Sequence, residues 1–142
     1  MTDIDKLAWL HIENKKLLCA RSKGKETFYS PGGKREAGET DQQALLREIK
    51  EELSIDLLPE TINHAGTFKA QAHGKPKGTM VKMTCYYGEY TGNITPAAEI
   101  EEIAWLSSAD KEKCSVVTHI IRIKQNLCFL SSRDTFSKLS IF

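Results

Sequence analysis

The sequence predicts an α+β fold in which a mixed β-sheet lies between helices, as an α/β/α sandwich. Several short stretches alternate apolar and polar residues, which is typical of strands with one buried face. Two stretches, residues 40–54 and 115–130, instead carry apolar side chains at helical spacing. The order is three strands, a helix, three strands and a second helix. This order favours a mixed sheet covered by helices, and periodicity alone leaves the order of the strands open.

Two apolar runs near the N-terminus, residues 6–13 and 15–21, flank Asn14. Asparagine tolerates the left-handed backbone of a tight turn, so the two runs are expected to pair as a hairpin. A shorter strand at residues 28–29 runs into Ser30-Pro31-Gly32-Gly33, where proline and glycine end regular structure.

The first helix is the element that the sequence defines best. Thr40 and Gln43 have the spacing of a capping box, in which each side chain bonds a free backbone N–H at the helix start. Leu45, Ile49 and Leu53 then recur every four residues and predict the face that packs on the core. The helix is expected to end near residues 53–54.

The second half of the chain continues the same alternation of strands and turns. The expected elements are strands at 65–73 and 79–90 joined by a turn at 74–78, a loop at 91–96, a strand at 101–106, a helix at 115–130 and a loose tail at 131–142.

Length and composition indicate one domain over residues 1–142, with its core at about residues 6–130. Twenty Lys and Arg oppose nineteen Asp and Glu, a balance that argues against a nucleic-acid partner. No stretch has the ~20 apolar residues that cross a bilayer, so no membrane partner is expected. Acidic residues precede the first short apolar run, unlike a secretory signal, and Cys19 and Cys85 lie in strand-like runs typical of buried thiols. We expect a cytoplasmic monomer or homodimer.

Three carboxylates on the first helix suggest chemistry. Glu48, Glu51 and Glu52 stand at i, i+3 and i+4, beside the apolar stripe. Like charges at this spacing destabilise a helix by about 0.2–0.5 kcal/mol per pair, so a bound cation would offset the repulsion. Oxygen ligands favour Mg²⁺ or Mn²⁺. Arg47 and Lys50 could offset it instead, which leaves a solvated, mixed-charge helix face as the alternative.

The loop before the helix adds to the metal interpretation. Glycine lacks a Cβ, so Gly32-Gly33 can bring bare backbone close to a ligand, and a carbonyl there could complete a metal shell. Glu39 precedes the helix, within reach of Arg47 if the loop folds back. Together with the three carboxylates, the loop forms half of a metal site.

The segment resembles the Nudix box, Gly-x5-Glu-x7-Arg-Glu-aliphatic-x-Glu-Glu-x-Gly-aliphatic. Its counterpart here is Gly33-x5-Glu39-x7-Arg47-Glu48-Ile49-x-Glu51-Glu52-x-Ser54-Ile55, and every defined position but one matches. The departure is Ser54, which stands where the family has a glycine. Glycine after a helix supports a left-handed cap, so Ser54 puts the end of the helix and its stability in question more than the chemistry.

The resemblance implies a Nudix hydrolase of the MutT-like branch that uses Mg²⁺ or Mn²⁺ to cleave a nucleoside diphosphate linked to another group. By this resemblance Glu48 activates water, Glu52 acts with it, and Arg47 and Glu39 orient the site. The implied metal ligands are Glu48, Glu51, Glu52, the carbonyl of Gly32 and one further carboxylate. Glu99, Glu101 and Glu102 are the candidates for the last, with Glu102 preferred, and a solvated acidic loop is the alternative. Such an assignment agrees with the chemistry, since metal ions neutralise phosphoanhydride oxygens while a carboxylate accepts the proton of water.

The resemblance also suggests substrate contacts, from Arg21, Gly33 and Lys34. His73, Lys75 and Lys77 could close over phosphates, or form a solvated hairpin tip. The signatures of hydrolases of ADP-ribose, nucleotide sugars and dinucleoside polyphosphates are not evident, so a nucleoside tri- or diphosphate remains as the expected substrate. Those other compounds, and a Nudix-fold regulator that binds a nucleotide without cleaving it, are the alternatives.

Overall fold

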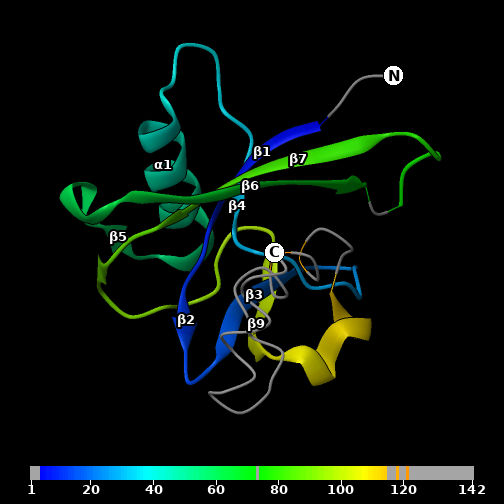
Figure 1. Cartoon of the computed structure of the whole chain (residues 1–142). Helices are drawn as coiled ribbons and strands as arrows, with labels where there is room; N and C mark the ends of the chain where they lie inside the picture. The colour runs from blue at the N-terminus through cyan, green and yellow to red at the C-terminus, as the bar shows by residue number, and fades with distance from the viewer. Residues whose placement is uncertain (1–3, 73, 115–117, 119–120, 122–142) are drawn as a thin grey trace, which may run out of the picture.

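The computed structural model describes residues 4–72, 74–114, 118 and 121 (Figure 1). A mixed four-stranded sheet in the order β4-β1-β7-β6 forms its centre. Strand β1 (Ile4–Trp9) runs parallel to β7 (Met80–Tyr87). The outer strands β4 (Gly32–Gly33) and β6 (Asn63–Gln71) pair antiparallel with β1 and β7, respectively. The fold class is therefore the predicted one, an α+β fold with a mixed sheet.

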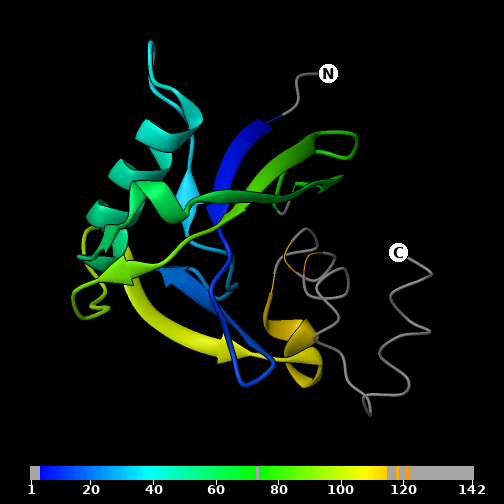
Figure 2. The ribbon, with the colours of Figure 1, turned by 60° about the vertical axis from the view of Figure 1, so that its left-hand side comes forward.

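A second, antiparallel sheet in the order β2-β3-β9 lies on one side of the mixed sheet (Figure 2). It consists of β2 (Ile12–Glu13), β3 (Lys16–Ser22) and β9 (Ile100–Leu106). Buried side chains from both sheets, among them Ala8, Cys19 and Cys85, form one apolar cluster. The main core thus lies between the two sheets, and it contains both cysteines expected there.

Helix α1 (Asp41–Leu53) packs against the mixed sheet with its own apolar cluster. Leu45, Ile49 and Leu53 are fully buried there against Leu7 and Trp9 of β1, which confirms the predicted stripe. The predicted capping box is present as well, because Thr40 Oγ1 accepts from the Gln43 N–H and Gln43 Oε1 accepts from the Thr40 N–H.

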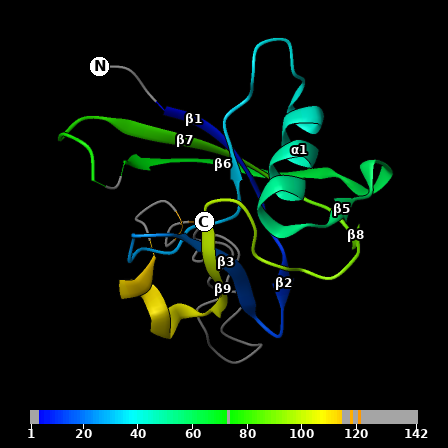
Figure 3. The same cartoon turned by 180° about the vertical axis from the view of Figure 1, so that it is seen from behind.

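Short elements complete the described part of the chain (Figure 3). They are β5 (Asp56–Leu57), which pairs with β8 (Tyr90–Thr91), and the 3₁₀ turns Pro59–Thr61 and Ser108–Lys113. The predicted helix at 115–130 lies outside the described residues apart from Thr118 and Ile121, and so does the tail at 131–142. The part of the chain that the structure describes holds no helix with the length and apolar character needed to cross a membrane.

The predicted hairpin of residues 6–13 and 15–21 is wrong in part. Only Ile12 and Glu13 pair with β3, whereas β1 belongs to the mixed sheet. The run divides because the Leu10 N–H already bonds the Tyr86 carbonyl of β7, while the carbonyl of the next residue, His11, accepts from the Leu18 N–H of β3. Strand 79–90 divides similarly, into β7 and β8. One continuous apolar run can therefore serve two sheets.

The helix ends at Ser54 in the left-handed conformation that the family glycine would adopt. Ser54 has φ 62° and ψ 28°, and its N–H donates to the Lys50 carbonyl at 3.1 Å. Side chains other than glycine clash mildly in this conformation, at a cost of about 1 kcal/mol. The cap geometry is therefore retained in spite of the substitution.

We expect Ser54→Gly to raise the free energy of unfolding by about 0.5–1 kcal/mol, because glycine adopts this backbone without strain. Urea denaturation of the two proteins measures the change. Ser54→Ala is the matched control, since alanine also has a Cβ and should give no gain. Equal stabilisation by both substitutions would show that the backbone conformation is not the cause.

Candidate functional site

Two carboxylates of α1 face β4 at the edge of the mixed sheet. Glu52 is 2% exposed, and its Oε1 accepts the N–H of Gly32 at 3.0 Å. Glu48 lies one turn earlier, with a side chain that is 16% exposed. The Glu51 side chain is 51% exposed and lies on the outer flank. The helix therefore presents Glu48 and Glu52 inward and Glu51 toward solvent.

The glycines of β4 are required by how closely the strand approaches its neighbours. A Cβ on Gly33 would lie 2.4 Å from Oε2 of Glu48. A Cβ on Gly32 would lie 2.0 Å from the Leu7 carbonyl oxygen of β1, and Gly32 also has φ 148°. A Cβ on Gly32 would thus clash with the backbone of β1, and one on Gly33 would displace the Glu48 carboxylate. The two glycines therefore place bare backbone beside the helix carboxylates.

Arg47 connects the loop before α1 to the carboxylates. Its Nε and Nη2 donate to the two oxygens of Glu39 at 2.7 and 2.8 Å, a forked arrangement that fixes the guanidinium plane. Nη1 lies 3.3 Å from Glu48 and 3.2 Å from Glu51. Nη2 also donates to the Lys34 carbonyl. Arg47 therefore partly neutralises Glu48 and Glu51 and holds the loop against the helix, and it makes the contact with Glu39 that was expected if the loop folds back.

Burial and charge perturb the acidities of these groups in opposite directions. Burial, together with the negative charges of Glu99 and Glu48, raises the pKa of Glu52 to about 8, despite the hydrogen bond from Gly32. Burial likewise raises the pKa of Glu48, against the opposing effect of Arg47. The hydrogen bonds from Arg47 and the Glu36 backbone lower the pKa of Glu39 to about 2. The negative charges of Glu48 and Glu52 are thus only partly balanced by nearby positive charge, whereas Arg47 balances the charge of Glu39.

Glu99 is a further acidic residue of the site. The loop after β8 bonds the last turn of α1, with the Thr95 N–H on the Leu53 carbonyl and the Ala97 N–H on the Glu52 carbonyl, both at 2.9 Å. These bonds satisfy carbonyls left open at a helix end. They also bring the Glu99 side chain to hydrogen-bonding contact with Glu52.

Glu102 and Arg21 are bonded to each other instead. They face one another across β3 and β9, and Arg21 Nη2 donates to Glu102 Oε1 at 2.8 Å. Arg21 Nη1 also donates to the Lys25 carbonyl. The structure therefore assembles Glu39, Arg47, Glu48, Glu52 and the two glycines, places Glu51 at the margin, and directs the polar groups of Arg21 and Glu102 to one another. Sequence reasoning considered Glu99 but preferred Glu102, because strand pairing was not visible.

A cleft of about 510 Å³ opens next to β4, between the two sheets. Gly32 lines it, and the same residue contacts Glu52, so the cleft leads toward the carboxylates. Lys34 is exposed at the start of the loop that follows β4. Lys75, from the connection predicted to be a hairpin tip, also lines the cleft, whereas His73 lies outside the described residues.

Chemically, the donor set suits a hard divalent cation. Glu48, Glu52 and backbone carbonyls offer only oxygen, and the inward carboxylates lack a full positive partner. The described side chains form no cluster of three or more His, Cys, Asp or Glu with the spacing of a metal site. The residues therefore fit Mg²⁺ or Mn²⁺ in type, and binding would require the carboxylates to draw together.

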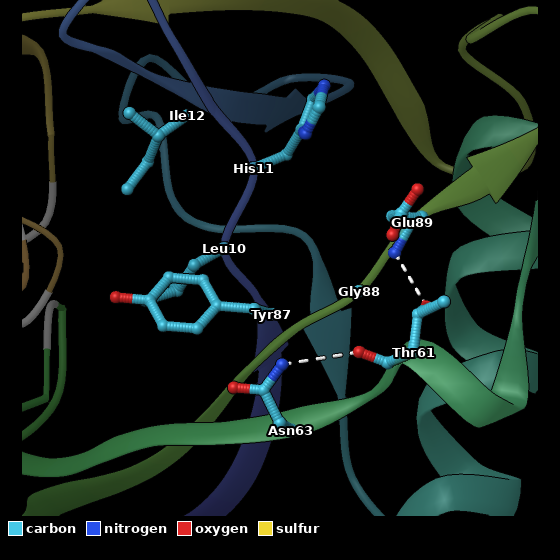
Figure 4. Close-up of a pocket in the computed structure, with 8 residues that line it drawn as sticks. All are labelled: Leu10, His11, Ile12, Thr61, Asn63, Tyr87, Gly88 and Glu89. Carbon is cyan, nitrogen blue, oxygen red and sulfur yellow. Dashed lines mark hydrogen bonds between the residues drawn. The ribbon is translucent and has the colours of Figure 1, made fainter.

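A second depression, of about 370 Å³, lies elsewhere on the surface (Figure 4). Its polar groups bond one another: Thr61 Oγ1 accepts the Glu89 N–H at 2.8 Å, and Asn63 Nδ2 donates to the Thr61 carbonyl at 3.2 Å. His11 stacks on Trp9, with ring centroids 4.8 Å apart. These groups satisfy each other, in contrast to the carboxylates of α1.

Residues 7–116 match the NUDIX domain family, so the chain belongs to the Nudix family. No curated protein matches the chain. Solved structures of similar fold include the E. coli ORF135 protein, with 22% identity, a TM-score of 0.65 and coverage of 86% of this chain and 87% of that one. They also include a MutT NUDIX hydrolase from Burkholderia pseudomallei, with 19% identity, a TM-score of 0.69 and coverage of 86% and 97%.

A third similar structure is the E. coli dihydroneopterin triphosphate pyrophosphohydrolase. It is 20% identical, with a TM-score of 0.62 and coverage of 84% of this chain and 91% of that one. At these identities the likeness shows a shared fold, in agreement with the mixed sheet and helix α1.

The raised pKa of Glu52 predicts how stability depends on pH without a divalent cation. The folded state binds the proton more tightly than the unfolded state, so its contribution is complete below about pH 4.5 and is lost as the pH rises through about 8. We expect the free energy of unfolding in EDTA to fall by on the order of 3 kcal/mol over this range. Urea denaturation at several pH values measures it. Glu52→Gln should flatten the profile, and an unchanged slope would contradict the assignment.

Proposed function

We propose that this protein is a Mg²⁺- or Mn²⁺-dependent pyrophosphohydrolase that cleaves the diphosphate linkage of a small nucleotide, a nucleoside tri- or diphosphate. The observation that carries the proposal is the pair Glu48 and Glu52, desolvated, short of positive charge and next to the bare backbone of β4. Membership of the Nudix family agrees with it. The similar structures named MutT and dihydroneopterin triphosphate pyrophosphohydrolase support a triphosphate substrate.

In this proposal Glu48 is the base that accepts a proton from the attacking water. Burial raises its pKa, which makes the carboxylate a stronger base near neutral pH. Glu52, Glu51 and the Gly32 carbonyl are the further proposed ligands of the cation. When bound, the divalent cation supplies positive charge that stabilises the phosphoanhydride oxygens as the bond breaks.

Arg47 and Glu39 have a positioning role in the proposal. Because the Glu39 carboxylate fixes the guanidinium plane with two hydrogen bonds, Arg47 Nη1 stays directed toward Glu48. This contact limits the rotation of the proposed base. The 3.3 Å distance leaves the Glu48 carboxylate free to accept a proton while it remains in place.

We expect Glu48→Gln to lower turnover by about 10²- to 10⁴-fold, because an amide cannot accept the proton of water. Phosphate or pyrophosphate release from nucleoside triphosphates with Mg²⁺ measures the loss, and circular dichroism checks the fold. Glu101→Gln is the matched control, since Glu101 is an exposed residue of β9. Near wild-type activity of Glu48→Gln, with Mg²⁺ still required, would refute the role of Glu48.

Millimolar Mg²⁺ is expected to raise the melting temperature by about 2–6 °C, because a cation bound only by the folded state stabilises it. Differential scanning fluorimetry measures the shift, with NaCl at equal ionic strength as the control for screening.

Gly33→Ala should reduce this shift and preserve the fold. The new Cβ meets the movable end of the Glu48 side chain and displaces the carboxylate rather than the backbone. If Gly33→Ala keeps the full shift, Glu48 is not a ligand of the cation.

A further inference from the structure

The cleft between the sheets has an apolar wall and a polar one, and two of its buried or half-buried polar side chains make no hydrogen bond within the described residues. Its polar lining consists of Lys6, Ser22, Lys25, Glu26, Thr27, Tyr29, Ser30 and Lys75. Ile4, Val81 and Met83 line it from the mixed sheet, and Ala72 from the end of β6. Its volume of about 510 Å³ is within the range of small-molecule sites, which are mainly apolar with a small number of placed polar groups. Two polar side chains, Lys6 and Ser30, stand out in this lining.

Lys6 occupies a position that the strand pattern reserves for an apolar side chain. Leu7 and Trp9 of β1 face α1, so the alternation directs Lys6 and Ala8 to the opposite face, where Ala8 packs in the core between the sheets. The register partner of Lys6 is the buried Met83. Within the described residues the half-buried ammonium group makes no hydrogen bond or ion pair. Burial and the charge of Lys34 lower its pKa, whereas the charges of Glu52 and Glu48 act in the opposite direction. The described residues therefore supply no direct hydrogen-bond acceptor for this group.

Ser30 is a second polar group without a partner. It is 2% exposed, and its Oγ is the one buried side-chain nitrogen or oxygen of the described residues that lacks a hydrogen bond. Leaving such a group unsatisfied costs about 1–3 kcal/mol. Ser30 lines the same cleft as Lys6 and precedes β4 by two residues.

We propose that Lys6 and Ser30 read the nucleobase of the substrate and select bases that present a carbonyl oxygen at position 6 of a purine or position 4 of a pyrimidine. This inference rests on the proposed hydrolysis of nucleotides. The apolar walls suit a flat ring, and Gly32 continues the lining toward Glu52, where the phosphates would lie. A phosphate bound by Lys6 is the competing outcome that the test separates.

The selectivity follows from the donors and acceptors of the two side chains. Lysine has three donors and no acceptor, whereas a serine hydroxyl can both donate and accept. A carbonyl at the base edge accepts from the ammonium group. An amino group at the same position, as in adenine or cytosine, is itself a donor and would leave the ammonium group unpaired. The Lys6 ammonium group alone therefore distinguishes a carbonyl from an amino group on the base, provided that it stays in place.

The first test compares substrates that differ by one functional group. Wild-type kcat/KM is expected to be about 10- to 100-fold higher for ITP than for ATP, and likewise for UTP over CTP, the ratio that a hydrogen bond to a charged group provides. Lys6→Met should bring both ratios close to one, whereas Lys82→Met, at an exposed position of β7, should leave them unchanged. Ratios near one in the wild type would overturn the proposal.

Inorganic tripolyphosphate separates base reading from phosphate binding. If Lys6 reads the base, Lys6→Met should hydrolyse tripolyphosphate as fast as the wild type does. An equal loss on tripolyphosphate and on all nucleotides would instead place a phosphate at Lys6, which would overturn the inference and leave the proposed hydrolysis intact.

Ser30→Ala provides a readout that a merely structural role would not give. It removes an unsatisfied buried hydroxyl, so the melting temperature should stay equal or rise, while binding of IMP in EDTA weakens by about 3- to 10-fold, as expected for one lost hydrogen bond. AMP is the reference ligand in the same titration calorimetry. If the wild type binds IMP in preference to AMP but hydrolyses no nucleotide, the proposed hydrolysis is refuted and base reading is supported. If Ser30→Ala binds IMP as tightly as the wild type does, Ser30 does not contact the base.

Discussion

The hydrogen bond from the Gly32 N–H to Glu52 Oε1 joins the edge of the mixed sheet to helix α1, and the geometry of the site depends on it. A carboxylate that is 2% exposed loses most of its hydration, and a single backbone donor compensates only part of that loss. The part of the lost hydration that this donor does not replace raises the pKa of Glu52. The fold thus holds the Glu52 carboxylate where its negative charge is unfavourable unless a positive charge lies beside it.

Two backbone features hold Glu52 in that position. On one side, β4 is so close to its neighbours that a Cβ on Gly32 would meet the backbone of β1 and a Cβ on Gly33 would displace the Glu48 carboxylate. On the other, the chain after β8 bonds the carbonyls of Leu53 and Glu52 and completes the end of the helix. The same bonds bring Glu99 to Glu52, which adds negative charge. Satisfying the helix terminus and concentrating acidic groups are consequences of one loop.

Local signals in the sequence were sufficient to predict α1 and the loop before it, but they could not predict which distant strands pair. The capping box, the apolar stripe and the link between Glu39 and Arg47 all depend on residues a few positions apart, and each is present. The choice between Glu99 and Glu102 depended on the pairing of β3 with β9, 81 residues apart at Arg21 and Glu102. Periodicity carries no information on such partners, as the divided run of residues 6–13 also shows.

Lys6 illustrates a different limit of pattern reading. In a strand that alternates, a single lysine on the apolar face is read as an irregularity of the pattern, because its environment is formed by strands distant in sequence. The structure shows that the face it shares with Ala8 looks into a cleft, with Ser30 nearby in the same lining. Since an unpaired ammonium and an unpaired hydroxyl both lower stability, their retention beside apolar walls is better explained by a ligand than by packing. By the same argument, the proposed cation would offset the unfavourable burial of Glu52. In the proposed function, one cleft therefore receives both ends of a nucleotide, the base at Lys6 and Ser30 and the phosphates near Glu52.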